Sequence, residues 1–427
     1  MPDIQVGEQV FDVAFHPAES LLYTGLLTGE VKAFRYDDQG QHESAFTVRP
    51  SKKSCRALET DADGAYLWTA GKGKGLHTID VSTHKVVESR KNAHEAPINR
   101  IKCLLPHMLA TGDDDGVVKL WDPRKPDAVR TYTKHFDFIS DFLWLEDKKH
   151  LVASSGDGTL SVMDVRSGKT EPHAQSEDQE DELLSMVTIK DNSKVVVGTQ
   201  LGMLSIFNRK SGWGDCVDRV PGHPHSIDAL CPLPSTYPSA HSTILTGSSD
   251  GLVRAVQLFP TKLLGVVADH GEFPVERIKV DRAGEGRWVA SAGHEETVKM
   301  TDLKDVFEDE EGGGDGECEE EKDEGQGQKF GVEEENDSDE EGEEREEEEQ
   351  ETPTVVVQEG PKDSSEEGDD AEDQEGKDSD DEGDDSDAPV QERKRKRKPE
   401  KDPLAAPGRR KKGRNEVVAD PAFFADL

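Results

Sequence analysis

The sequence predicts an all-β protein in which seven small four-stranded sheets close into a ring, a seven-bladed β-propeller, followed by a long charged tail. Three observations lead to this prediction. A turn sequence recurs seven times at nearly constant spacing, short alternating strands flank each turn, and the composition changes sharply near residue 308. The period identifies the blade, the strands identify the fold class, and the change in composition marks the end of the ring.

The recurring turns define the repeat. Its clearest copy, TGDDDGVVKLWDPRK at 111–125, has siblings in TGSSDGLVRAVQ at 246–257 and SSGDGTLSVMD at 154–164. Equivalent positions recur at steps of about 41 to 49 residues, which is the period of a four-stranded propeller blade. Because Asp and Gly accept the positive φ of tight hairpins, the acids are interpreted as turn residues and not as a metal or catalytic cluster. The equivalent positions are Gly29, Gly75, Gly116, Gly158, Gly202, Gly251 and Glu296.

Two apolar strands precede each turn. The first reads VFDVAFHP, INRIKCLL or ISDFLWLE, and the second reads LLYTG, LVASSG or STILTG. Alternation ending in turn residues is typical of strands. We expect the second set to line the centre of the ring. We also expect residues 3–6, DIQV, to form the outer strand of the seventh blade, which would close the ring and remove an open edge.

The repeats resemble the WD-repeat family of β-propellers across roughly residues 4 to 303. In that family a His near the start of the blade, a Ser or Thr, a turn Asp and a Trp form a buried hydrogen-bond relay. The resemblance implies a full relay in the third blade and partial ones in the fourth and sixth. The residues implied are, blade by blade, His94, Thr111, Asp115 and Trp121; His135, Ser154 and Asp157; and His223, Thr246 and Asp250.

No catalytic, metal or cofactor site is expected. The histidines recur at the blade period, which favours a structural role over metal binding, although His is a common ligand. The run GKGKG at 71–75 lacks the GxxxxGK[ST] spacing of a phosphate loop. A catalytic channel needs polar or metal-binding side chains converging from several inner strands, and the strands expected there carry no recurrent acid or histidine. We therefore expect no enzymatic activity and no small-molecule substrate.

The tail divides into three parts after the propeller at 1–307. Residues 308–390 hold about 41 acids and 5 bases, residues 391–414 hold about 12 bases and 3 acids, and residues 415–427 form a short end segment. So few apolar residues cannot offset the entropy of ordering the acidic part, which is predicted to be disordered. It is either a solubilising segment or a polyanion that competes with nucleic acid for basic protein surfaces.

Short motifs lie in this tail. Ser338, Ser364 and Ser379 each precede an acid by three residues, the pattern of acidophilic kinase sites. Two basic clusters about ten residues apart suit a bipartite nuclear import signal or a phosphate-binding arm. The cluster residues are Arg393, Lys394, Arg395, Lys396, Arg397, Lys398, Arg409, Arg410, Lys411 and Lys412.

The end segment contains a second kind of signal. Phe423, Phe424 and Leu427 could occupy one side of a helical turn as anchors for the apolar groove of a partner, or fold back onto the propeller. Within the propeller, residues 49–102 carry a local excess of basic side chains. Lys52, Lys53, Lys72 and Lys74 form a candidate RNA-facing rim, and the alternative is ordinary charge fluctuation.

The five cysteines are irregularly spaced and the N-terminus lacks a signal-peptide pattern, so we expect free thiols in a reducing compartment. No apolar run approaches the roughly 20 residues that span a bilayer, and we expect no membrane association.

Degenerate blades, the acidic tail with basic blocks, and the terminal DPAFFADL together resemble the nucleolar WD repeat-containing protein 55 family. This resemblance implies residence in the nucleus and nucleolus and a scaffold role in ribosome biogenesis and ribosomal RNA processing, with pre-ribosomal assembly factors as partners and RNA as a further contact. The alternative is a chromatin adaptor or a substrate receptor of a cullin ubiquitin ligase. The turn WDPR at 121–124 fits the WDxR-type motif of such receptors.

Overall fold

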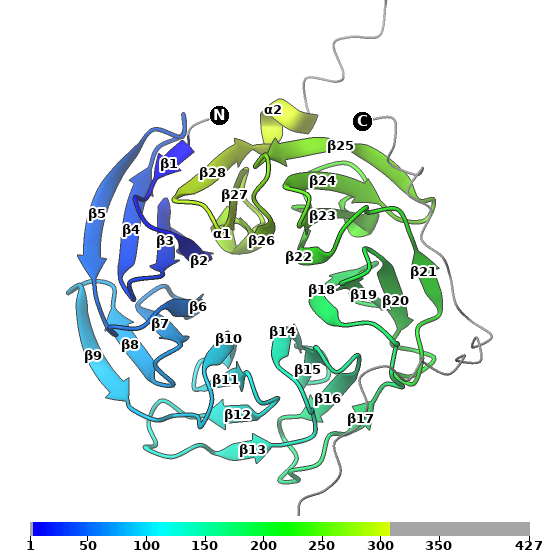
Figure 1. The fold of residues 1–427 in the computed structure, drawn as a ribbon, viewed down its shortest axis with the longest axis horizontal. Coiled ribbons are helices and arrows are strands. Elements are labelled where there is room, and N and C mark those ends of the chain that lie inside the picture. Colours follow the sequence, from blue (N-terminus) through cyan, green and yellow to red (C-terminus); the bar gives the residue numbers. More distant parts are fainter. Residues whose placement is uncertain (1–2, 308–427) are drawn as a thin grey trace, which may run out of the picture. The chain divides into compact units, whose positions relative to one another are not determined.

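The computed structural model describes residues 3–307, which form seven four-stranded antiparallel sheets arranged as blades around a central channel (Figure 1). Within each blade the strands run in order from the channel outward. The seven-bladed all-β prediction is confirmed.

The first three blades follow one another without interruption. Blade one contains β2 (Val10–Phe15), β3 (Leu21–Leu26), β4 (Val31–Tyr36) and β5 (His42–Val48). Blade two contains β6 (Cys55–Thr60), β7 (Tyr66–Gly71), β8 (Leu76–Asp80) and β9 (Lys85–Arg90). Blade three contains β10 (Ile98–Leu105), β11 (Met108–Asp113), β12 (Val118–Trp121) and β13 (Arg130–Tyr132).

The next three blades repeat this order, and the outer strands of blades four and five are as short as two and three residues. Blade four contains β14 (Ile139–Leu145), β15 (His150–Ser155), β16 (Leu160–Asp164) and β17 (Ala174–Gln175). Blade five contains β18 (Leu183–Ile189), β19 (Lys194–Thr199), β20 (Leu204–Asn208) and β21 (Asp218–Val220). Blade six contains β22 (Ile227–Pro232), the 3-10 helix η1 (Ala240–Ser242), β23 (Thr243–Ser248), β24 (Leu252–Gln257) and β25 (Lys262–Asp269).

Blade seven joins the two ends of the ring. It contains β26 (Val275–Val280), the short helix α1 (Asp281–Gly284), β27 (Trp288–Gly293) and β28 (Thr297–Asp302), and helix α2 (Leu303–Phe307) follows. Its outer strand is β1 (Asp3–Gln5), which pairs antiparallel with β28 and places Ile4 opposite Val298. The predicted closure by the N-terminal strand is confirmed.

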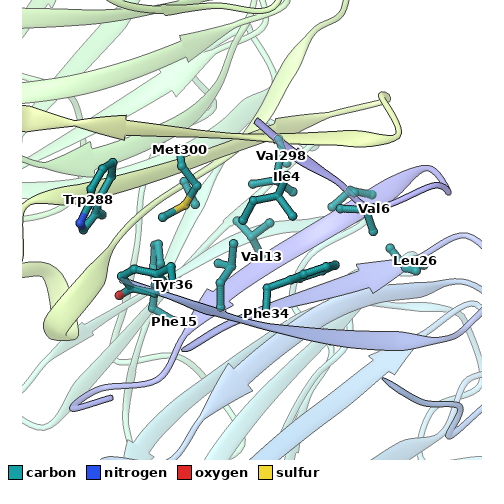
Figure 2. Close-up of a cluster of buried hydrophobic side chains, with 14 residues drawn as sticks. Ile4, Val6, Val13, Phe15, Leu26, Phe34, Tyr36, Trp288, Val298 and Met300 are labelled. Carbon is teal, nitrogen blue, oxygen red and sulfur yellow. The ribbon is translucent and has the colours of Figure 1, made fainter. Parts of the chain in front are cut away.

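The core is divided among the blade interfaces. Within residues 3–307, each of the seven interfaces holds one cluster of buried apolar side chains. At the closing interface, Ile4 and Val6 lie among Val298 and Met300 of β28 and residues of blade one (Figure 2). Because every described blade buries its faces against its neighbours, a single blade has no core of its own, and the stability of the ring depends on its closure.

The turn interpretation holds for most blades. Gly29, Gly116, Gly158, Gly202 and Gly251 all have φ between 77° and 87°, as tight hairpins require. Blade two differs, because its positive φ falls on Lys74 (61°) and not on Gly75. The predicted equivalence is therefore shifted by one residue there.

The prediction about the channel was wrong. The innermost strands are β2, β6, β10, β14, β18, β22 and β26, and LLYTG, LVASSG and STILTG belong to the second strands β3, β15 and β23 (Figure 1). The second strands resemble inner ones because these segments carry no charged residue and consist of apolar and small polar residues. That pattern arises because both of their faces are covered by adjacent blades, whereas a channel-facing strand meets water on one side.

Candidate functional site

One face of the ring gathers most of the candidate residues. In an antiparallel blade, the loop before the inner strand and the hairpin between the second and third strands lie at the same end. We call this end the upper face and the opposite end the lower face. Neighbouring loops interlock here. A Cβ at Gly116 would lie 2.7 Å from the carbonyl oxygen of Asp137 and 2.8 Å from that of His135, so only glycine fits.

Blade three contains the most complete relay. His94 is 1% exposed; its Nδ1 lies 2.7 Å from Asp113 Oδ2 and its Nε2 lies 2.6 Å from Thr111 Oγ1. Trp121 Nε1 donates to the same Thr111 hydroxyl at 2.7 Å. The prediction that Asp115 is the acid of this relay is wrong. It is exposed at the hairpin tip, and its amide donates to Asp113 Oδ1, so Asp113 is the relay acid.

The fourth and sixth blades carry modified relays. His135 Nδ1 lies 3.0 Å from Asp157 Oδ2, as predicted from sequence, but its Nε2 contacts Ser161 Oγ at 2.7 Å. Ser154 instead pairs with the hydroxyl of Ser140 at 2.8 Å, so its assignment to the relay was wrong.

In blade six, His223 Nε2 lies 2.9 Å from Thr246 Oγ1. Asp250 accepts two hydrogen bonds from Arg254, at 3.0 and 2.6 Å. The prediction that Asp250 faces the histidine was wrong, because the buried guanidinium four residues later takes both carboxylate oxygens.

Blade seven holds a relay that the sequence prediction missed. His270 Nδ1 contacts Glu295 Oε1, and its Nε2 lies 2.7 Å from Ser291 Oγ. Glu295 replaces the turn Asp one position earlier than Glu296, which had been aligned with the hairpin glycines. A carboxylate in the hairpin of a blade that begins with His was the available signal.

The relays stabilise the upper loops. Burial lowers the pKa of His94 and of His270, and burial together with Arg254 lowers that of His223 to about 3. Burial alone would raise the pKa of Asp157, but hydrogen bonds from His135, Thr159 and the amide of Phe136 hold it at about 2. Imidazoles that are buried and hydrogen-bonded inside a blade have a structural use.

The channel mouth is formed by a repeated backbone irregularity. Every inner strand has a β-bulge just after its first residue. A bulge re-aims side chains at the rim of a closed sheet, and here the seven bulge residues line one cavity of about 270 Å³. They are Phe11, Arg56, Asn99, Ser140, Leu184, Asp228 and Glu276.

Charges in the channel serve contacts between blades. Asp12 Oδ2 accepts from the amide of Leu58 in the next blade at 2.6 Å, and its Oδ1 lies 3.2 Å from Arg277. Asp141 repeats the arrangement by accepting from the amide of Met186 at 2.9 Å. Among the described residues no group of three or more His, Cys, Asp or Glu could hold a metal ion. Burial raises the pKa of Asp228 to about 6.

The upper face exposes apolar side chains around this mouth. Phe136 is 88% exposed in the loop before β14, and Leu201 is 63% exposed in the hairpin after β19. Charges on the same face are segregated. Five carboxylates lie in the loop at 177–182 before β18, whereas the four predicted rim lysines lie in the two adjoining loops at the top of blade two. The structure thus brings Lys52, Lys53, Lys72 and Lys74 together.

Comparison with known proteins identifies the relatives of this chain. The sequence model of the WDR55 family matches residues 1–306. The chain belongs to the WDR55 family. It is 62% identical over 324 residues to WD repeat-containing protein JIP5 of Laccaria bicolor, covering 73% of this chain and 77% of that one. It is 34% identical over 310 residues to WD repeat-containing protein 55 of Arabidopsis thaliana, covering 72% and 84%.

As a WDR55-family propeller, the protein is a protein-binding scaffold. The closed ring and the exposed Phe136 and Leu201 of its upper face are consistent with this role. Among the described residues, Cys55, Cys103, Cys216 and Cys231 are free thiols. None of the described helices is long and apolar enough to cross a bilayer.

The lower face of this WDR55-family propeller carries the WDPR turn. Asp122 accepts from the Arg124 side chain at two distances of 2.9 Å, and this contact lowers the carboxyl pKa. The next blade repeats the turn with Asp164 and Arg166 at two distances of 3.0 Å. Both arginine side chains are mostly exposed, at 66% and 63%.

The predictions for the tail lie outside the described residues. These are the acidic segment 308–390, the basic clusters 393–398 and 408–414, the candidate phosphosites Ser338, Ser364 and Ser379, and the candidate partner motif Phe423, Phe424 and Leu427.

Proposed function

We propose that this protein is a non-enzymatic scaffold of the nucleus and nucleolus that acts in ribosome biogenesis and ribosomal RNA processing. Its partners are pre-ribosomal assembly factors bound on the upper face. The observation that carries the proposal is an exposed apolar side chain on this face whose backbone is held by a hydrogen bond. Phe136 is almost fully exposed, yet its amide donates to Asp157 Oδ2 at 3.0 Å, the carboxylate that also holds His135.

An exposed aromatic on an anchored backbone supports protein binding for a physical reason. Exposing a phenylalanine to water is unfavourable, and burying it in a partner recovers roughly 1.5–3 kcal/mol. Because the loop is already ordered by the relay, little conformational entropy is lost on binding. Aromatic residues of this kind are common anchors at protein interfaces.

The charges of the tail support the cellular location. Two blocks of Lys and Arg at 393–398 and 408–414 suit nuclear import. The acidic segment before them suits contact with basic proteins, which are abundant partners wherever ribosomes assemble. Both charged segments lie outside the propeller, and the sequence resemblance points to the same location.

A second function is favoured by the paired turns on the lower face. Arg124 and Arg166 each lie in a D-x-R turn in which the guanidinium is held by Asp122 or Asp164. Two such arginines in consecutive blades fit the adaptor contact of a cullin ligase receptor. A chromatin adaptor has no comparable structural feature among residues 3–307.

Co-purification separates these functions. The tagged full chain should retain pre-ribosomal RNA and assembly factors, and Phe136→Ala should weaken recovery of at least one factor about tenfold or more. Val87→Ala, a half-exposed side chain on outer strand β9, is the matched control and should change nothing. Replacing the Lys and Arg of both tail clusters with Ala should leave the protein cytoplasmic. Recovery of a ligase adaptor without pre-ribosomal RNA, lost on Arg124→Ala, would replace the proposal by the second function.

A further inference from the structure

The upper end of blade two carries a basic surface made by three loops. Lys52 and Lys53 lie between β5 and β6, Lys72 and Lys74 lie in the β7–β8 hairpin, and all four are exposed. Arg49 and Lys91 flank them and are exposed as well. We call these six residues the blade-two basic patch: Arg49, Lys52, Lys53, Lys72, Lys74 and Lys91.

The positive charge of this patch is not neutralised. Within the described part of the chain, none of its six residues forms an ion pair with a carboxylate, whereas nearby Arg56, Arg90 and Lys102 each have one. Arg49 donates to the carbonyl oxygen of Thr28, and Lys74 donates to that of Glu95. Unpaired cations gathered at one end of a moderately acidic propeller attract a polyanion.

The backbone beneath the patch is well fixed. The amide of Lys72 donates to Ser54 at 3.0 Å, the amide of Lys74 donates to Gly71 at 3.0 Å, and the amide of His94 donates to Lys74 at 3.2 Å. These hydrogen bonds join all three loops. The lysine side chains therefore extend from anchored positions into solvent, where their ammonium groups can meet phosphates, and that of Lys74 also donates to the carbonyl oxygen of Glu95.

The patch lacks the means to read bases. Its loops, 49–54, 71–75 and 91–97, contain no Phe, Tyr or Trp, and their one imidazole, His94, is buried in the relay. Stacking on exposed aromatic rings is the usual way to bind unpaired bases. Lysine without such a platform contacts phosphate and carries no sequence information.

We propose that the blade-two basic patch binds the phosphate backbone of RNA without base recognition. The choice of RNA over another polyanion rests on the proposed role in ribosome biogenesis. The inference that the patch binds phosphate rests only on its unpaired, exposed cations. The acidic segment of this chain is the competing occupant, and the experiment below separates the two.

The test measures RNA binding by the purified full chain in a background where both tail basic clusters are changed to Ala, so that they do not mask the propeller. One variant carries Lys52→Ala, Lys53→Ala, Lys72→Ala and Lys74→Ala. The matched control carries the same change at four exposed lysines in lower-face loops, Lys125, Lys148, Lys169 and Lys210. Fluorescence anisotropy with two single-stranded RNAs of equal length and different sequence is recorded from about 50 to 200 mM salt, a range over which phosphate contacts respond strongly.

Each phosphate contact to a single strand contributes about 0.7 to the slope of log K against log salt. The patch variant should lose a slope of about 2.8, which is roughly 600-fold in affinity at 0.1 M salt if all four lysines make contact. The control should keep the parent slope, and the two RNAs should bind equally.

Three results would overturn the proposal: equal losses in patch and control variants, a clear preference for one RNA sequence, or no RNA binding by the full chain combined with patch-dependent binding after truncation behind Phe307. The last result would assign the patch to the acidic segment. Truncation is justified because all seven blade interfaces lie within residues 3–307. If assembly factors still co-purify with the patch variant, the scaffold function stands whatever the RNA result.

Discussion

Closure of the ring by β1 can be tested with one side chain. Ile4 is fully buried at the closing interface and lies opposite Val298, with Val6 and Met300 in the same cluster. Its neighbour Gln5 pairs with Thr297 but is exposed. Ile4→Ala therefore removes packing and keeps the strand, whereas Gln5→Ala keeps both.

The magnitude follows from burial. Ile4→Ala removes three carbon groups at about 0.8 kcal/mol each and leaves a cavity, so the loss should be about 2–5 kcal/mol. A loss of 1 kcal/mol lowers Tm by roughly 2–4 °C for chains of 150–250 residues and by less for longer ones, so a drop of roughly 4–10 °C is expected in this larger ring. Deleting residues 1–7 should cost more, because it also exposes the edge of β28 and removes the bond from the Val6 amide to Glu296.

Urea and thermal unfolding followed by circular dichroism measure these differences. The expected order of stability is parent, Gln5→Ala, Ile4→Ala, deletion, with Gln5→Ala within about 0.5 kcal/mol of the parent. An Ile4→Ala variant that unfolds with the parent, or a deletion no worse than Gln5→Ala, would show that the ring does not depend on this strand and would refute the reasoning.

Two further predictions concern the relays. Asp113→Ala should cost about 2–3 kcal/mol in urea unfolding, because it leaves buried His94 without its carboxylate partner, while exposed Asp115→Ala should cost under about 0.5 kcal/mol; equal effects would contradict the assignment of Asp113. Because burial lowers the pKa of His94, His223 and His270 in the folded state, the stability they contribute is complete above the unfolded pKa near 6.5 and is lost as pH falls. Protonation of each histidine should reduce the unfolding free energy by up to about 2 kcal/mol at pH 5. Buried carboxyls whose pKa is raised offset part of this loss. A stability that increases from pH 7 to pH 5 would refute this sign.

Much of the fold could be predicted from local chemistry. The hairpin glycines had to adopt positive φ wherever a blade turned, so Gly116 and Gly251 marked the repeat without any knowledge of the ring. The alternating segment at residues 3–6 had no partner nearby in sequence, and a ring needs one more strand, which predicted β1. Outer strands such as β9 were not found, because solvent on one side leaves their side chains largely exposed and without a clear pattern.

The tertiary structure decided which polar groups meet. Three consecutive aspartates occupy one hairpin, and only the path of the backbone past buried His94 selects Asp113 over Asp115. The same holds for Arg254, which takes the carboxylate of Asp250 away from His223 in blade six.

The identity of the strands that line the channel could not be predicted from the sequence pattern either. An inner strand and a second strand are both short and apolar, and they differ in whether a neighbouring blade or water covers one face. The bulges that aim Arg56 and Asp228 at the channel depend on strand pairing in three dimensions. The sequence by itself determined the number of blades, their turns and the closing strand, because those follow from conformational preferences local to the chain. Which strand faced the channel, which acid met which histidine and which lysines shared a surface were decided by contacts between residues far apart in sequence.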